Sequence, residues 1–162
     1  MKRTKRECLM QRLPAPADIL ALIPAQEDTA QTAVICAREN SLMLCASPEH
    51  VLACLAERED KALSLIRRNA ARLMARRRNI ILPILHGCVL SPVMTRPSDE
   101  GGTLGYINIA YKPLLAGSGN TTDLALRSGT VIRALWQLPT VQRLVCEGRA
   151  VHYKLLLDVQ QQ

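Results

Sequence analysis

Arginine is the residue type whose spacing most clearly suggests chemistry in this sequence. Eight cations and no Asp or Glu lie between Lys61 and Ser98, namely Lys61, Arg67, Arg68, Arg72, Arg76, Arg77, Arg78 and Arg96. The 162-residue chain has a net charge of +7, so everything outside this stretch sums to −1. Guanidinium groups match phosphate geometry, and a local block of one sign indicates an anionic partner. Nucleic acid is the leading candidate.

Six of these arginines are the candidate DNA-binding residues, because their spacing is helical. Arg68, Arg72 and Arg76 recur every four residues, which places them on one helix face. Helix-dipole stabilisation explains one or two cations near a helix end, and like charges at i,i+4 repel. We expect this row to follow a phosphate backbone, and the neighbouring arginines to reach a narrow, AT-rich minor groove. The full set is Arg67, Arg68, Arg72, Arg76, Arg77 and Arg78.

Other interpretations of the same block stay open at this stage. The arginines could be the solvated face of an amphipathic helix, although solvated faces usually mix both signs. They could bind RNA or a ribosome without reading sequence, or dock an acidic protein. An N-terminal run, Lys2-Arg3-Lys5-Arg6, is either a minor-groove arm or a solubilising start. We slightly favour the second interpretation of that run.

The remaining residue types give no pattern typical of catalysis or of a metal site. The six cysteines lack C-x-x-C spacing and are expected to be free thiols packed as small apolar groups. His50, His86 and His152 lack metal-ligand spacing, and Gly101–Gly105 precedes a strand rather than opening a helix. Trp136 is interpreted first as core and second as a self-association contact. We therefore expect no enzyme activity, no cofactor, no metal and no small-molecule substrate.

Composition points to a cytoplasmic globular protein with an aliphatic core. Hydrophobic residues make up 48% and charged residues 22% of the chain, whereas aromatic residues make up only 2%. A platform that stacks single-stranded bases would lack rings. The longest apolar run, residues 80–94, is interrupted by Pro83, His86, Gly87 and Pro92, so no membrane span is expected.

The elements that must position the arginines follow from hydrophobic periodicity. Residues 1–31 are interpreted as a flexible basic arm punctuated by proline, and residues 32–162 as a single domain. The apolar runs at 33–37 and 42–46 predict a β-hairpin. Ser47-Pro48-Glu49 marks a helix start. A second helix is predicted over 59–78, because Leu63, Ile66, Ala70 and Leu73 form one apolar stripe.

Beyond Asn79 the pattern favours strands. Residues 80–85 and 88–94 are apolar runs separated by a turn, 103–111 alternates, and Ser128-Gly129 separates 123–127 from 130–135 as a hairpin. Val141, Leu144 and Val145 begin a last helix, which Gly148 is expected to end or kink. The fold class is therefore α+β, with a mostly antiparallel sheet of about five or more strands and helices packed on one face.

In this order of motifs the chain resembles the ComK family of bacterial competence transcription factors. The resemblance runs from about Thr32 to Cys146. A hairpin and a short helix lead to Cys54, and a basic helical segment then runs into Pro83-Ile84. Leu90-Ser91-Pro92-Val93 forms a turn, and Leu104-Gly105-Tyr106-Ile107 stands where the family has Cys-x-Trp-Ile. Ser128-Gly129 and a closing helix complete the series.

The resemblance implies a sequence-specific transcription activator. Such a protein binds AT-rich duplex DNA, largely through the minor groove, and self-associates on its sites. We therefore expect double-stranded DNA and further copies of the chain as partners.

Overall fold

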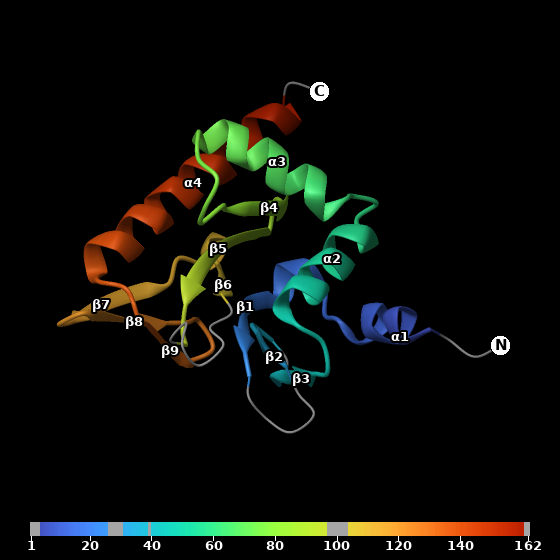
Figure 1. Ribbon diagram of the computed structural model, residues 1–162, viewed down its shortest axis with the longest axis horizontal. Helices are drawn as coiled ribbons and strands as arrows, with labels where there is room; N and C mark the ends of the chain where they lie inside the picture. The colour runs from blue at the N-terminus through green and yellow to red at the C-terminus, as the bar shows by residue number, and fades with distance from the viewer. Residues whose placement is uncertain (1–3, 26–30, 39, 97–103, 161–162) are drawn as a thin grey trace.

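The computed structural model describes residues 4–25, 31–38, 40–96 and 104–160, with side chains up to Lys154. Its centre is a six-stranded antiparallel sheet in the order β3-β2-β1-β6-β5-β4, shown in Figure 1. The strands are β1 (Ile19–Pro24), β2 (Thr32–Cys36), β3 (Leu42–Leu44), β4 (Leu82–Leu85), β5 (Cys88–Met94) and β6 (Leu104–Asn108). The sheet thus joins the beginning of the chain to its middle.

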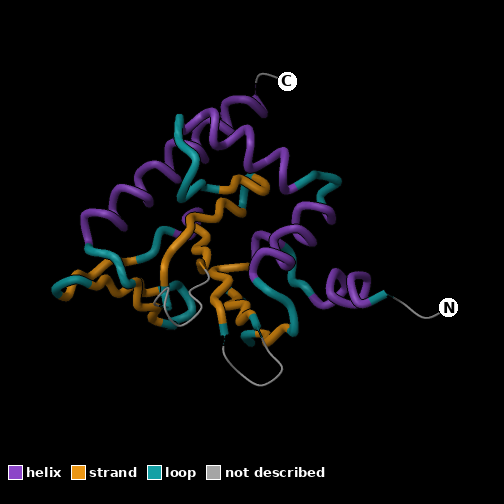
Figure 2. The backbone as a smooth tube through the Cα atoms, viewed as in Figure 1, coloured by secondary structure: helices purple, strands orange, loops and turns teal. Residues whose placement is uncertain are grey.

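A second, three-stranded antiparallel sheet follows, and the described residues form four α-helices that pack against the sheets (Figure 2). Its strands are β7 (Leu114–Ser118), β8 (Thr121–Ala125) and β9 (Val131–Ala134). The helices are α1 (Lys5–Arg12), α2 (Pro48–Arg58), α3 (Leu63–Met74) and α4 (Leu138–Gln160). In the described part of the chain, the 3-10 turn η1 (Pro16–Asp18) precedes β1 and the 3-10 turn η3 (Ile109–Tyr111) follows β6.

Both faces of the large sheet are buried, and each has its own apolar core. Along β5, Cys88 and Leu90 point into the core beneath α1, α2 and α3, whereas Val89 and Val93 point into the core beneath α4 and the second sheet. This is the two-residue alternation of a strand. The α+β class with a mostly antiparallel sheet is confirmed. The sequence pattern did not predict that α4 and a second sheet would cover the opposite face.

The prediction that residues 1–31 form a flexible arm is wrong, because residues 19–24 form a central strand of the large sheet. β1 pairs with β2 on one side and with β6 on the other, and Ile19 and Leu22 are fully buried. An uninterrupted apolar run is what a strand buried on both faces looks like, and Pro24 is tolerated where the strand ends. The prolines suggested a loose segment, whereas the apolar run between them determines its structure.

Both ends of the helix predicted over 59–78 differ in the structure, whereas the predicted N-cap of α2 and the predicted hairpins are confirmed. Ser47 caps α2 by accepting a hydrogen bond from the His50 amide, as its sequence predicts. The helix expected over 59–78 spans only Leu63–Met74, because residues 59–62 close α2 and Ala75 adopts a left-handed C-cap with φ of 53°. Ending the helix there removes the last three arginines from it, and with them one i,i+4 repulsion.

All six cysteines lie in the described residues and none of them forms a disulfide, as predicted, and Cys36, Cys54 and Cys88 are buried. Burial raises the pKa of Cys88 from 9.0 to about 12. The unfolded chain therefore releases this proton at a lower pH than the folded chain, and stability falls as pH rises from 9 towards 12.

We expect the unfolding free energy to fall by roughly 1 kcal/mol per pH unit above pH 9 from this group. Urea denaturation at pH 8 and pH 10.5 measures the loss. Cys88→Ala should reduce the pH dependence, and exposed Cys146→Ala should leave it unchanged. Equal pH dependence in wild type and Cys88→Ala would refute the assignment.

Candidate nucleic-acid interface

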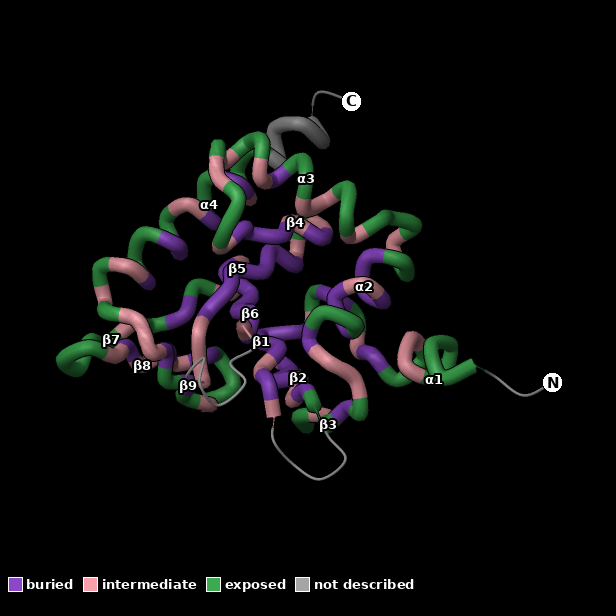
Figure 3. The backbone as a smooth tube through the Cα atoms, viewed as in Figure 1, coloured by how far each residue is buried: buried purple, intermediate pink, exposed green. Residues whose placement is uncertain are grey.

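Helix α3 presents one face to the core and the opposite face to solvent (Figure 3). Ala70 is buried against the sheet, and Ile66 packs beside it in the same core. Arg68 and Arg72 lie four residues apart on the outer face and are exposed. Four residues advance the helix by about 6 Å, so the two side chains lie about that far apart along the axis. The helix is therefore a platform that holds two guanidinium groups in a row on the surface.

Arg67 does not belong to this outer row. Its guanidinium makes a bidentate ion pair with the Glu49 carboxylate of α2, in which Nη2 donates a 3.0 Å hydrogen bond to Oε2. The hydrogen bond to Glu49 raises the pKa of Arg67 further. Arg67 also interacts with Tyr106 of β6, whose own pKa is raised by burial and partly lowered again by the guanidinium. Arg67 thus fixes α3 to α2 and to the sheet.

Arg76 is likewise tied within the fold. It forms an ion pair with Glu147 of α4, and its Nη2 donates a 2.7 Å hydrogen bond to the Asn79 carbonyl oxygen. Its Nε is buried with no hydrogen-bond partner. The side chain is 26% exposed, so Arg76 joins the turn after α3 to α4 and offers little charge to a ligand.

Four of the six candidate arginines remain exposed, and we call them the arginine ridge: Arg68, Arg72, Arg77 and Arg78. Arg77 and Arg78 follow the left-handed Ala75 in the turn beyond α3. Among the residues that the structure describes, no ion pair or hydrogen bond involves a ridge side chain. The ridge is thus a row of uncompensated cations on one helix and the turn that follows it.

The ion pairs of Glu49 and Glu147 with two of the candidate arginines could not be predicted from the sequence. The two glutamates lie 18 and 71 residues from their arginine partners. No local spacing rule reports such pairs, because they depend on how α2 and α4 pack against α3. Only the position of Glu49 in the first turn of α2 could be predicted from the sequence.

The basic N-terminal run is only partly described. Lys2 and Arg3 lie outside the described residues. Arg6 belongs to α1 and forms an ion pair with Glu57 of α2. Since α1 packs on α2, Lys5 and Arg6 are held on a helix and are not part of an extended arm.

Two histidines from distant parts of the chain meet at the surface. His86 Nδ1 and His152 Nε2 lie 2.9 Å apart, which joins the β4–β5 turn to α4. No third potential metal ligand joins them, since the described residues contain no cluster of three or more His, Cys, Asp or Glu side chains able to hold a metal ion.

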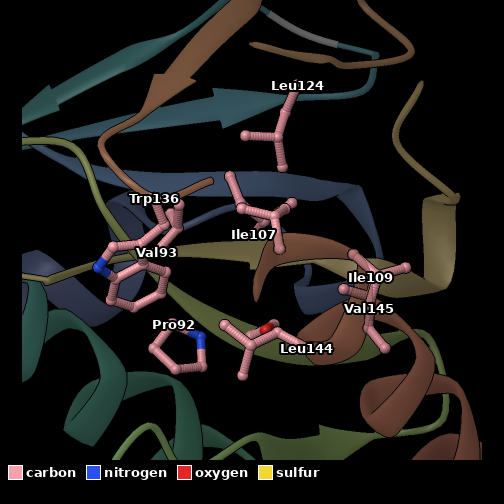
Figure 4. A pocket seen from close by; sticks show the side chains of 10 residues that line it. Pro92, Val93, Ile107, Ile109, Leu124, Trp136, Leu144 and Val145 are labelled. Atoms are coloured by element: carbon pink, nitrogen blue, oxygen red, sulfur yellow. The ribbon is translucent and has the colours of Figure 1, made fainter. Parts of the chain in front are cut away.

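The hollow between the two sheets and α4 is a packing gap (Figure 4). Apolar side chains surround it, among them Val93, Ile107, Trp136 and Leu144. About 10 Å³ is free inside, which is room for one water molecule at most. Trp136 is partly buried and packs against this core, in agreement with its interpretation as a core residue.

Comparisons with known proteins identify no relative of this chain. Family models, curated proteins and solved structures were all searched, and none matches the chain. Within the described residues, no helix combines the length and the apolar character needed to span a membrane.

Proposed function

We propose that this protein binds duplex DNA through the arginine ridge. The observation that carries the proposal is the exposure of four unpaired arginines along α3 and the turn after it. Arginine groups along a helix neutralise successive phosphates and release their counterions, which supplies most of the affinity of such contacts. Arg68 and Arg72 contact the phosphate backbone of the DNA, and Arg77 and Arg78 extend the contact beyond the helix.

The distribution of acidic groups favours this function over an ordinary solvated face. Two carboxylates from other elements reach the arginines of this segment, and both pair with the inner side chains Arg67 and Arg76. None reaches the ridge within the described part of the chain. A sequence selected only for solubility has no reason to keep the outer row free of acids.

The resemblance to the ComK family adds a finer proposal. It favours AT-rich duplex sites, self-association on DNA and a role in transcription activation. Arg77 and Arg78 are the ridge residues placed outside the helix, so they are the side chains that we assign to the minor groove.

A competition assay tests the type of nucleic acid. A labelled AT-rich duplex is bound at 0.1 M salt and competed with GC-rich duplex, double-stranded RNA or single-stranded DNA. We expect the unlabelled AT-rich duplex to compete best. Preferential competition by RNA would favour the RNA-binding alternative, and absence of duplex binding would refute the proposal.

Replacing Glu147 by Gln should strengthen DNA binding. The substitution removes the carboxylate that pairs with Arg76, which lies next to Arg77 and Arg78. A fifth available arginine should steepen the salt dependence of log K by about 0.9. Fluorescence anisotropy at several salt concentrations measures the change, and Glu57→Gln, which breaks the Arg6 pair on α1, is the control. Equal strengthening in both variants would show a net-charge effect only.

A further inference from the structure

An apolar groove runs beside the arginine ridge, between α3 and the C-terminal part of α4. Two adjoining hollows of about 700 and 340 Å³ share Leu73, Val151 and Lys154 as lining residues, so they form one continuous groove. The groove extends along α3, from Lys61 before the helix to Arg76 after it. Figure 1 shows α3 and α4 next to each other at this side of the molecule.

The side chains in this groove are more apolar and more exposed than folding alone requires. Leu65 and Leu73 are 45% and 44% exposed, whereas Ala70 of the same helix is buried and Ile66 is partly buried. They share the groove with Ile66, Pro83 and Val151. Single exposed leucines are common on surfaces, whereas several that line one groove indicate a contact surface.

The residues that line the groove include three cations and two carboxylates. The cations are Lys61, Lys154 and Arg76, and Lys61 Nζ donates a 2.6 Å hydrogen bond to the Ile84 carbonyl oxygen. Arg72 is exposed on the outer face of α3 and lies outside the lining. Asp60 is the exposed acidic residue at one end, and Glu147 at the other end is paired with Arg76. An occupant with acidic flanks would therefore complement the rim.

We propose that this groove docks an amphipathic helix of a partner protein, with an apolar stripe facing Leu65 and Leu73 and acidic residues on its flanks. α3 is 12 residues long, about 18 Å, which matches about three turns of such a helix. A second copy of the same face would bring two cationic ridges together. Nucleic acid would leave the apolar floor unused. The inference does not rest on DNA binding by the ridge.

A designed peptide tests the groove. The probe is a fluorescein-labelled 15-residue peptide of Leu, Glu and Ala whose leucines form one helical stripe. We expect micromolar binding by anisotropy at 0.15 M salt. A peptide of the same composition with the leucine stripe scrambled should bind at least tenfold more weakly. Equal binding of the two peptides would overturn the proposal, and so would no binding of the striped peptide at 100 µM.

Variants of the protein locate the site. Leu65→Ser with Leu73→Ser should weaken binding of the striped peptide at least tenfold, and both positions are exposed enough for the fold to persist, which circular dichroism checks. Leu114→Ser is the matched control, because Leu114 is 75% exposed on β7. Equal weakening by the control would overturn the assignment. Duplex DNA binding should be unchanged in the groove variant, which separates failure of this proposal from failure of the ridge.

Discussion

Replacing Arg68 and Arg72 together by Gln is expected to lower the affinity for duplex DNA roughly 60-fold at 0.1 M salt, because each phosphate contact contributes about 0.9 to the log K against log salt slope. Gln preserves side-chain length and favours helices about as well as Arg, so α3 should persist. Neither arginine has a partner within the described fold, and the free energy of unfolding should change by less than about 0.5 kcal/mol.

A matched control separates the ridge from net charge. Arg127→Gln with Arg133→Gln lowers the net charge by the same two units at exposed positions in or beside the second sheet, where Arg127 lies over the Tyr111 ring and Arg133 pairs with Asp123. We expect this variant to bind DNA within about threefold of the wild type, since it leaves every ridge contact in place. If both double variants lose the same affinity for DNA, the ridge is not the contact surface, and the net charge of the protein accounts for DNA binding. Electrophoretic mobility shift titrations at one salt concentration measure both.

Gly148→Val is expected to destabilise the protein by about 3 kcal/mol. α4 approaches the sheet so closely at Gly148 that an added Cβ would lie 2.1 Å from Ile109 Cδ1 and 3.0 Å from Ile109 Cγ1. Ile109 of η3 is 2% exposed and lines the packing gap of about 10 Å³, so its side chain can move away from α4 only by displacing other core groups. Overpacking of this kind costs about 1–3 kcal/mol, and Val brings a second branch into the same contact. The effect outweighs the roughly 0.3 kcal/mol that replacing Gly gains in helix propensity.

Two comparisons make this prediction specific. Ala150→Val lies two residues away on the exposed side of α4 and should cost less than about 1 kcal/mol. Gly148→Ala combined with Ile109→Val should be more stable than the sum of the two single changes, because the smaller side chain gives the new methyl group its space. Urea denaturation measures Gly148→Val, Ala150→Val, the two single changes and their combination, which are five variants in all. A Gly148→Val protein as stable as the wild type would show that α4 does not pack against η3 as described.

Local signals in the sequence predicted the elements whose boundaries depend on neighbouring residues. Ser47 and Pro48 start α2, and the Ser128-Gly129 turn joins β8 to β9 with Gly129 at φ of 89°. β1 was missed, because its apolar run stands among prolines and its partners β2 and β6 are not local. Gly148 was expected to break α4, whereas its missing side chain serves close packing on Ile109.

The candidate site was predictable only as an excess of arginine. Periodicity placed Arg68 and Arg72 on the outer face correctly. It also placed Arg76 in the same row, but the helix ends at Met74 and Glu147 captures that side chain. Which cations stay available depends on carboxylates that folding brings from α2 and α4. The apolar groove depends in the same way on the packing of α4, which no pattern within α3 reports.

The salt dependence of duplex binding measures the number of phosphates that the protein neutralises. Four ridge arginines predict a slope of log K against log salt near −3.6 for the wild type, and near −1.8 for Arg68→Gln with Arg72→Gln. Titrations between about 0.05 and 0.3 M salt give both slopes under identical conditions. Equal slopes in the two proteins, or a wild-type slope near zero, would contradict the central claim that these arginines contact DNA.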